Sequence, residues 1–101
     1  MTRRQVRFTA TARRHLQSAT QWWTEQTGQS ELIADEMEVV ISLVAVLPGV
    51  GSPYPRPRFP EMRRLYLERL NAHIYYTHSA EEVTIRAFWH ARRKSGPTIR
   101  P

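Results

Sequence analysis

The chain has 101 residues, a length that suits one domain with a single hydrophobic core. It contains no cysteine, and its four histidines lack the spacing of metal ligands, so we expect no disulfide, no metal and no other cofactor. Its apolar stretches are far shorter than the ~20 residues that cross a bilayer, and its N-terminus lacks the apolar core of a secretory signal. A cytoplasmic protein without membrane contact is therefore expected.

The net charge of the chain is +6, and residues 51–101 carry all of it. This half holds nine arginines and one lysine against four glutamates, whereas residues 1–50 balance five arginines with five acids. A basic half-domain favours an acidic partner, either nucleic acid or an acidic protein segment.

The first half of the chain predicts one strand followed by two helices. Residues 4–8 alternate weakly and suit an edge strand. Thr9 or Thr11 then caps a helix whose apolar residues recur every three or four positions as far as Gly28. Ser30 caps a second, more apolar helix that Pro48 stops, so the two helices form an antiparallel hairpin.

Residues 48–60 contain five of the seven prolines and predict an irregular loop. Three runs of strand-forming residues follow, at 62–68, 72–77 and 83–90, with connections short enough for antiparallel hairpins. With the first strand added, the chain predicts an α+β sandwich of one strand, a helical hairpin and a three-stranded antiparallel meander. Residues 1–101 would form one domain with a loose tail over 95–101.

Alternation along the last strand predicts two unlike faces of the sheet. One face would be aliphatic and pack against the helices, with Val83, Ile85, Ala87 and Trp89. The other face would be basic and aromatic, with Arg64, Tyr66, Arg86, Phe88 and His90. Since aromatic side chains can stack on bases, this second face also suits a plain, non-catalytic RNA-binding module.

Five segments carry a resemblance to a known family. They are the strand end at Phe8-Thr9, the helix-ending PGVG at 48–51, MRRL at 62–65, AHIYY at 72–76 and FWHARR at 88–93. In this order and spacing they resemble the RelE/ParE superfamily of toxins from bacterial toxin–antitoxin modules. The last segment is similar to the end of ParE-type members, which include plasmid stabilisation system proteins. The resemblance covers nearly the whole chain and implies the same strand–helix–helix–meander fold.

The superfamily has two main activities. RelE-type members cut mRNA in the ribosomal A site without a metal, whereas ParE-type members inhibit DNA gyrase and are not nucleases. The RelE-type pattern is poorly kept here: its strand arginine falls at His73, and two of its lysines fall at Arg64 and Tyr66. The resemblance therefore favours a non-enzymatic gyrase inhibitor that an acidic, ParD-like antitoxin neutralises. The alternative is ribosome-dependent mRNA cleavage, for which the candidate catalytic residues are Arg64, His90 and Arg92.

Two sets of candidate binding residues follow. The target would bind Arg64, Tyr66, Arg86, His90, Arg92 and Arg93. The antitoxin would bind Trp22, Tyr75, Trp89 and Arg93, in an association that weakens with salt. Plainer roles stay open: Arg64 paired with a nearby Glu, His90 bonded across the sheet, and a solvated charge run at Arg92 and Arg93.

Overall fold

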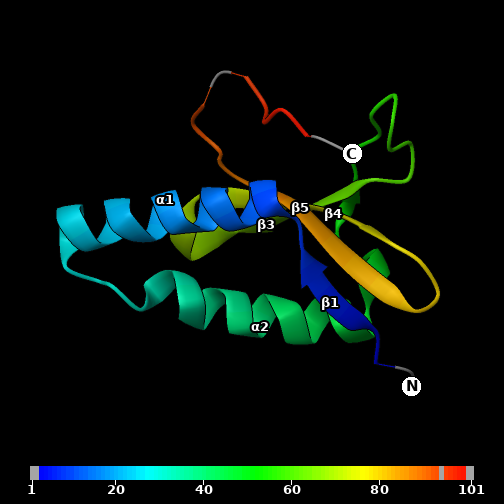
Figure 1. The fold of residues 1–101 in the computed structure, drawn as a ribbon, viewed down its shortest axis with the longest axis horizontal. Helices are drawn as coiled ribbons and strands as arrows, with labels where there is room; N and C mark the ends of the chain where they lie inside the picture. The colour runs from blue at the N-terminus through cyan, green and yellow to red at the C-terminus, as the bar shows by residue number, and fades with distance from the viewer. Residues whose placement is uncertain (1–2, 94, 100–101) are drawn as a thin grey trace.

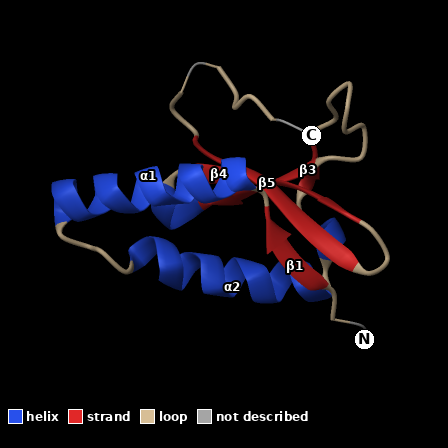
Figure 2. Ribbon diagram, in the orientation of Figure 1, coloured by secondary structure: helices blue, strands red, loops and turns tan. Residues whose placement is uncertain are grey.

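A mixed five-stranded sheet carries two helices on one of its faces (Figures 1 and 2). The computed structural model describes residues 3–93 and 95–99. Its elements in chain order are β1 (Gln5–Phe8), α1 (Ala10–Thr27), α2 (Leu32–Val46), η1 (Pro48–Val50), β2 (Ser52–Pro53), β3 (Arg63–Leu67), η2 (Glu68–Leu70), β4 (Ala72–His78) and β5 (Glu82–His90), where η1 and η2 are short 3-10 helices. The predicted α+β class is confirmed.

The strands lie in the order β1-β5-β4-β3-β2. β3, β4 and β5 form the predicted antiparallel meander, and the two-residue strand β2 is added beside β3. β1 joins as a parallel strand, with Gln5 opposite Glu82 and Phe8 opposite Ile85. β1 therefore borders only the first half of β5. Within the described residues, α1 covers the second half of β5. An uncovered strand edge there could pair with other chains.

Both helices begin and end near the predicted residues. Thr9 caps α1, since its hydroxyl accepts from the Ala12 N–H at 3.1 Å, and Gly28 ends the helix with a left-handed φ of 74°. The prediction that Ser30 caps the second helix is wrong. The N-cap residue is Glu31, whose carbonyl accepts from the Asp35 N–H, and α2 begins at Leu32. Neither helix combines the length and apolar character that crossing a membrane requires.

The main core lies between the helices and the sheet. It gathers the apolar stripes of α1 and α2 and the helix-facing side chains of the strands, including Ile33, Val40, Val44, Ile74, Tyr76, Val83 and Ile85. Tyr76 also ties the loop after α2 to the sheet. Its buried hydroxyl donates to the Pro48 carbonyl at 2.7 Å and accepts from the Gly51 N–H at 2.9 Å. The loop thus leaves the helices at a defined place, and β2 can pair with β3.

A β-bulge interrupts β5 at Arg86. Tyr75 of β4 lies opposite Ala87, but the next residue, Tyr76, lies opposite Ile85. Arg86 is therefore an extra residue without a cross-strand partner. Beyond such a residue the two faces of a strand exchange.

The exchange overturns part of the predicted face assignment. Val83 and Ile85 pack against the helices as expected. Phe88, however, also packs in the helix-facing core, while Ala87 and Trp89 belong to a second cluster on the opposite face. The prediction was wrong for these three residues, because strict alternation assumes a strand without an inserted residue.

This opposite face, which we call the outer face, is partly covered. The loop over residues 54–62 folds back on it, and the Tyr54 N–H donates to the Met62 carbonyl at 2.8 Å. Phe59 and Met62 are buried there with Tyr75 and Ala87. The predicted irregular loop therefore has a fixed place on the sheet.

The C-terminal segment also contacts the outer face, although a loose tail was expected. The Trp89 indole N–H donates to the Ser95 carbonyl at 2.8 Å, and Ile99 packs on the second cluster. Ile99 thereby shields apolar surface from water, which favours this arrangement over a loose one. Residues 100 and 101 of the predicted tail, and Lys94 of the basic run, lie outside the described residues.

Candidate functional site

A groove of about 660 Å³ opens where α1 passes the end of β5. Its apolar lining residues are Ala19, Trp22, Trp23, Leu70, Phe88 and Trp89. Its polar lining residues are His15, Ser18, His90, Arg92 and Arg93. The volume lies in the range of binding pockets, and the lining suits a ligand with both apolar and acidic groups.

His15 joins α1 to β5 at this groove. Its Nδ1 accepts a hydrogen bond from the Phe88 backbone N–H at 3.2 Å, and its ring lies 5.1 Å from the Trp89 ring. Partial burial lowers the pKa of His15, and the nearby charges of Arg14 and Arg93 lower it further. The neutral ring is the form that this hydrogen bond requires, because a protonated Nδ1 has no lone pair to accept with.

Aromatic and cationic groups both line the groove. The Arg93 guanidinium lies 4.1 Å from the centre of the Trp89 ring, so it is held over an aromatic face. Trp22 meets Trp23 edge to face with centroids 5.3 Å apart, and Trp22 is 51% exposed. Tryptophan and arginine are the residue types that contribute most of the binding energy in many protein interfaces.

The groove is electrostatically one-sided. None of its described lining residues carries a carboxylate, while Arg92 and Arg93 are both exposed cations. The Arg92 N–H donates to the His90 Nδ1 at 3.2 Å, which fixes the turn that follows β5. The site can therefore attract and orient acidic groups from a partner.

The structure brings five of the predicted binding residues together at this groove. They are Trp22, Trp89, His90, Arg92 and Arg93. Sequence reasoning placed His90 on the outer, basic face. It lines the groove beside α1 instead, because the bulge changes the facing of the end of β5.

The other four predicted residues lie on the outer face. Arg64 sits 4.7 Å from the centre of the Tyr54 ring, and Arg56 approaches the same ring at 3.7 Å. Tyr66 donates to the Asn71 side chain at 2.7 Å and is half exposed. Tyr75 is only 3% exposed under Tyr54, so it offers little surface to an antitoxin. The fourth residue, Arg86, donates from Nε to the Thr77 hydroxyl at 2.9 Å.

The nuclease candidates are divided between these two surfaces. Arg64 stacks on the outer face, whereas His90 and Arg92 line the groove. A general acid and a cation that stabilise one phosphorane must reach the same atoms. A different histidine, His73, lies 5.2 Å from the Tyr66 ring, and burial together with Arg64 lowers its pKa.

Sequence reasoning missed His15, Ser18 and Ala19 as groove residues. His15 and Trp22 each lie three or four positions from Ser18 and Ala19, so the four residues share one side of α1, at the border of the core stripe. That spacing was a usable signal. The spacing alone could not identify a groove, because only the fold shows that β5 ends beside this side of α1.

No group of three or more His, Cys, Asp or Glu side chains within residues 3–93 and 95–99 is arranged to hold a metal ion.

One comparison with known proteins found a similar architecture. No family model and no curated protein matches the chain. A solved structure described as the chromosomal ParDE toxin–antitoxin system of P. aeruginosa contains a chain with a similar fold, at a TM-score of 0.66 and 18% sequence identity. The alignment covers 88% of this chain and 97% of that chain. At such low identity the likeness shows the fold alone, which is the fold of a chain from a toxin–antitoxin complex.

Proposed function

We propose that this protein is the toxin component of a type II toxin–antitoxin module. The observation that carries the proposal is the likeness of fold, over nearly the full length of both chains, to a chain of the ParDE system. The motifs at 48–51, 62–65, 72–76 and 88–93 support it independently, since they depend on the residues alone and not on the fold. The protein would act in the cytoplasm as a single domain, and without a cofactor.

The groove between α1 and β5 is the proposed binding site for an acidic, ParD-like antitoxin. Trp22 and Trp89 offer apolar surface, and Arg93 offers a cation that stacking holds in place. A disordered acidic segment that folds on binding could satisfy both. Tyr75, the fourth predicted antitoxin residue, would contribute from beneath the outer loop rather than by direct contact.

Reversing the charge at the groove tests this assignment. The variant Arg93→Glu should bind the acidic product of the neighbouring gene about tenfold more weakly, because it sets a carboxylate against the acidic segment. The matched control is Arg58→Glu, which reverses another exposed arginine, in the outer loop. Titration calorimetry at low and high salt provides the measurement. Equal losses in both variants, or affinity that does not depend on salt, would contradict the assignment.

The proposed target is DNA gyrase, and the proposed target-binding residues are Arg64, Tyr66, Arg86, His90, Arg92 and Arg93. Three of these, His90, Arg92 and Arg93, line the groove. An antitoxin seated there would cover them, and neutralisation would follow by direct competition. This overlap supports a binding toxin without requiring a reaction at the site.

A supercoiling assay tests the target. Gyrase, relaxed plasmid and ATP are combined with increasing amounts of the folded protein. Inhibition of supercoiling, together with trapped linear DNA, is the expected result, and prior addition of the antitoxin should restore activity. Unimpaired supercoiling by a protein that still binds its antitoxin would contradict gyrase as target.

The two alternative functions have less support in the geometry. Ribosome-dependent mRNA cleavage would use Arg64, His90 and Arg92, which lie on separate surfaces. A non-catalytic RNA-binding module would need an open basic and aromatic face, but Phe88 packs in the core and the loop over 54–62 covers part of that face.

A further inference from the structure

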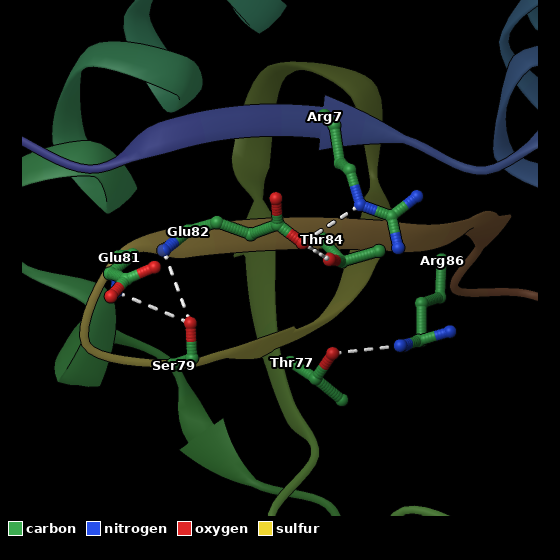
Figure 3. A network of polar contacts seen from close by, with 7 residues as sticks. All are labelled: Arg7, Thr77, Ser79, Glu81, Glu82, Thr84 and Arg86. Carbon is green, nitrogen blue, oxygen red and sulfur yellow. Dashed lines mark hydrogen bonds and ion pairs between the residues drawn. The ribbon is translucent and has the colours of Figure 1, made fainter.

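Two arginines from neighbouring strands lie on the outer face, away from the groove. Arg7 of β1 pairs with Thr84 of β5, and Arg86 follows two residues later on β5. Val6, Phe8, Val83 and Ile85, which alternate with them, pack in the helix-facing core. The side chains of Arg7, Thr84 and Arg86 therefore share the outer face, as Figure 3 shows.

Each guanidinium is held by another group through its Nε. Arg7 Nε donates to Glu82 Oε1 at 2.9 Å, and Arg86 Nε donates to the Thr77 hydroxyl at 2.9 Å (Figure 3). Arg86 is also fixed from one side, since its Cζ lies 4.3 Å from the centre of the Phe59 ring. Because both side chains are oriented before any ligand arrives, little conformational freedom is lost on binding.

The terminal nitrogens of both groups are left for a ligand. In the part of the chain that the structure describes, they donate to no protein acceptor, and the Arg7 side chain is 55% exposed. Partial burial lowers the pKa of Arg86, and the nearby like charge of Arg7 lowers it further. Glu82 and Glu61 oppose this shift only in part. An anion between the two guanidinium groups would relieve their repulsion.

We propose that Arg7 and Arg86 form a phosphate-binding site on the outer face of the sheet. The shape of the ligand favours phosphate over carboxylate. Two guanidinium groups from two strands offer their terminal nitrogens, and the oxygens of a tetrahedral phosphate point in more directions than the two coplanar oxygens of a carboxylate, so phosphate is better suited to accept from both. Alternation along β5 places Arg86 on the same face as Thr84, the partner of Arg7, and the Thr77 hydroxyl holds its guanidinium there.

The proposal goes beyond antitoxin binding at the groove, because the site lies on the other face of the sheet from the helix-facing core and shares no residue with the groove. Arg86 is also one of the proposed gyrase-binding residues, but the phosphate titration below requires neither gyrase nor antitoxin and so tests the site by itself. The phosphate could come from a free phosphate or phosphomonoester, or from the backbone of a nucleic acid. Both sources present the same chemistry to Arg7 and Arg86, and an experiment can separate them.

The test is an NMR titration of the ¹⁵N-labelled protein with inorganic phosphate at constant ionic strength. Saturable shifts are expected at Arg7, Thr84 and Arg86, and the variant Arg7→Gln should raise the dissociation constant about tenfold. Arg7→Lys, which keeps the charge but loses the fork, should bind with intermediate affinity. The matched control is Arg69→Gln, which removes another exposed arginine in an ion pair, with Glu36 at 3.6 Å.

Three results would overturn the proposal. They are shifts that do not saturate, equal losses in Arg7→Gln and Arg69→Gln, and acetate binding as tightly as phosphate. Oligothymidylate without terminal phosphates then identifies the source. If it produces the same Arg7-dependent shifts, the site takes a nucleic-acid backbone. If only inorganic phosphate and phosphomonoesters produce them, the site takes free phosphate groups.

Discussion

His15 is the side chain that most directly links the stability of this protein to the shape of its groove. It bonds the Phe88 backbone, contacts the Trp89 ring and lines the groove, all in its neutral form. Charged neighbours on two segments face it, Arg14 on α1 and Arg93 after β5, and both oppose its protonation. Protonation would therefore act on the groove wall and on the packing of α1 at once.

The lowered pKa of His15 predicts that the protein loses stability in mild acid. The unfolded chain takes up a proton near the usual value of 6.5, whereas the folded protein takes it up at a lower pH. Between these values the unfolded state binds more protons, so the free energy of unfolding falls as the pH falls below 6.5. The lowered pKa of His73 acts in the same direction.

Urea unfolding at a series of pH values measures this effect. The variant His15→Asn should show a flatter pH dependence, because an amide oxygen can accept from the Phe88 N–H but does not titrate. His73→Asn serves as the comparison, since it removes only the second contribution. If His15→Asn kept the full pH dependence of the natural protein, the role given to His15 would be wrong.

At the scale of elements, the contact between the η1–β2 loop and the sheet determines where the outer loop starts. A Cβ added at Gly51 would lie 2.7 Å from the Arg64 carbonyl oxygen and 2.7 Å from the Tyr76 hydroxyl oxygen. At Gly49, two residues earlier, an added Cβ would meet nothing within 4 Å. The two glycines therefore form a matched pair for substitution.

Gly51→Ala should destabilise the fold by about 1–3 kcal/mol, because the methyl group displaces the Tyr76 hydroxyl or the β3 backbone. Gly49→Ala should leave the free energy of unfolding nearly unchanged. Urea denaturation of both variants compares them directly. Equal stability of the two variants would show that the loop moves freely, against the close packing seen here.

The same scale shows how far the sequence could predict this structure. The order of elements, the capping by Thr9 and the end of α1 at Gly28 were predictable, since each depends on local chemistry. The bulge at Arg86 was not, because no local signal marks a one-residue slip between two long strands. That single slip reversed the predicted faces of Ala87, Phe88 and Trp89.

The candidate site was predictable only in part for a related reason. The tryptophans and the basic run at 92–93 were recognisable as binding residues from their type and charge. The sequence could not predict which of these residues lie close together, because the groove joins a helix from the first half of the chain to the last strand. Arg7 was not singled out, because its neighbour Arg86 is 79 positions away and the parallel pairing of β1 with β5 brings them together.

At the scale of the whole molecule, the charges are arranged around two separate surfaces. The groove presents Arg92 and Arg93 with an exposed tryptophan. The outer face presents Arg64 and Arg86 over aromatic rings, and Arg7 paired with Glu82. A toxin of this design would be neutralised at the first surface. The second surface would stay available to phosphate groups even in the complex with an antitoxin.

Induced expression in a bacterial host, with and without the neighbouring acidic gene product, tests the proposed toxin function most directly. Growth should stop when the protein is produced alone and continue when both proteins are produced together. Trp22→Ala, which changes an exposed antitoxin-binding residue outside the target-binding set, should stay toxic but be neutralised poorly by the antitoxin. Unimpaired growth of cells that accumulate the folded natural protein would contradict the assignment as a toxin.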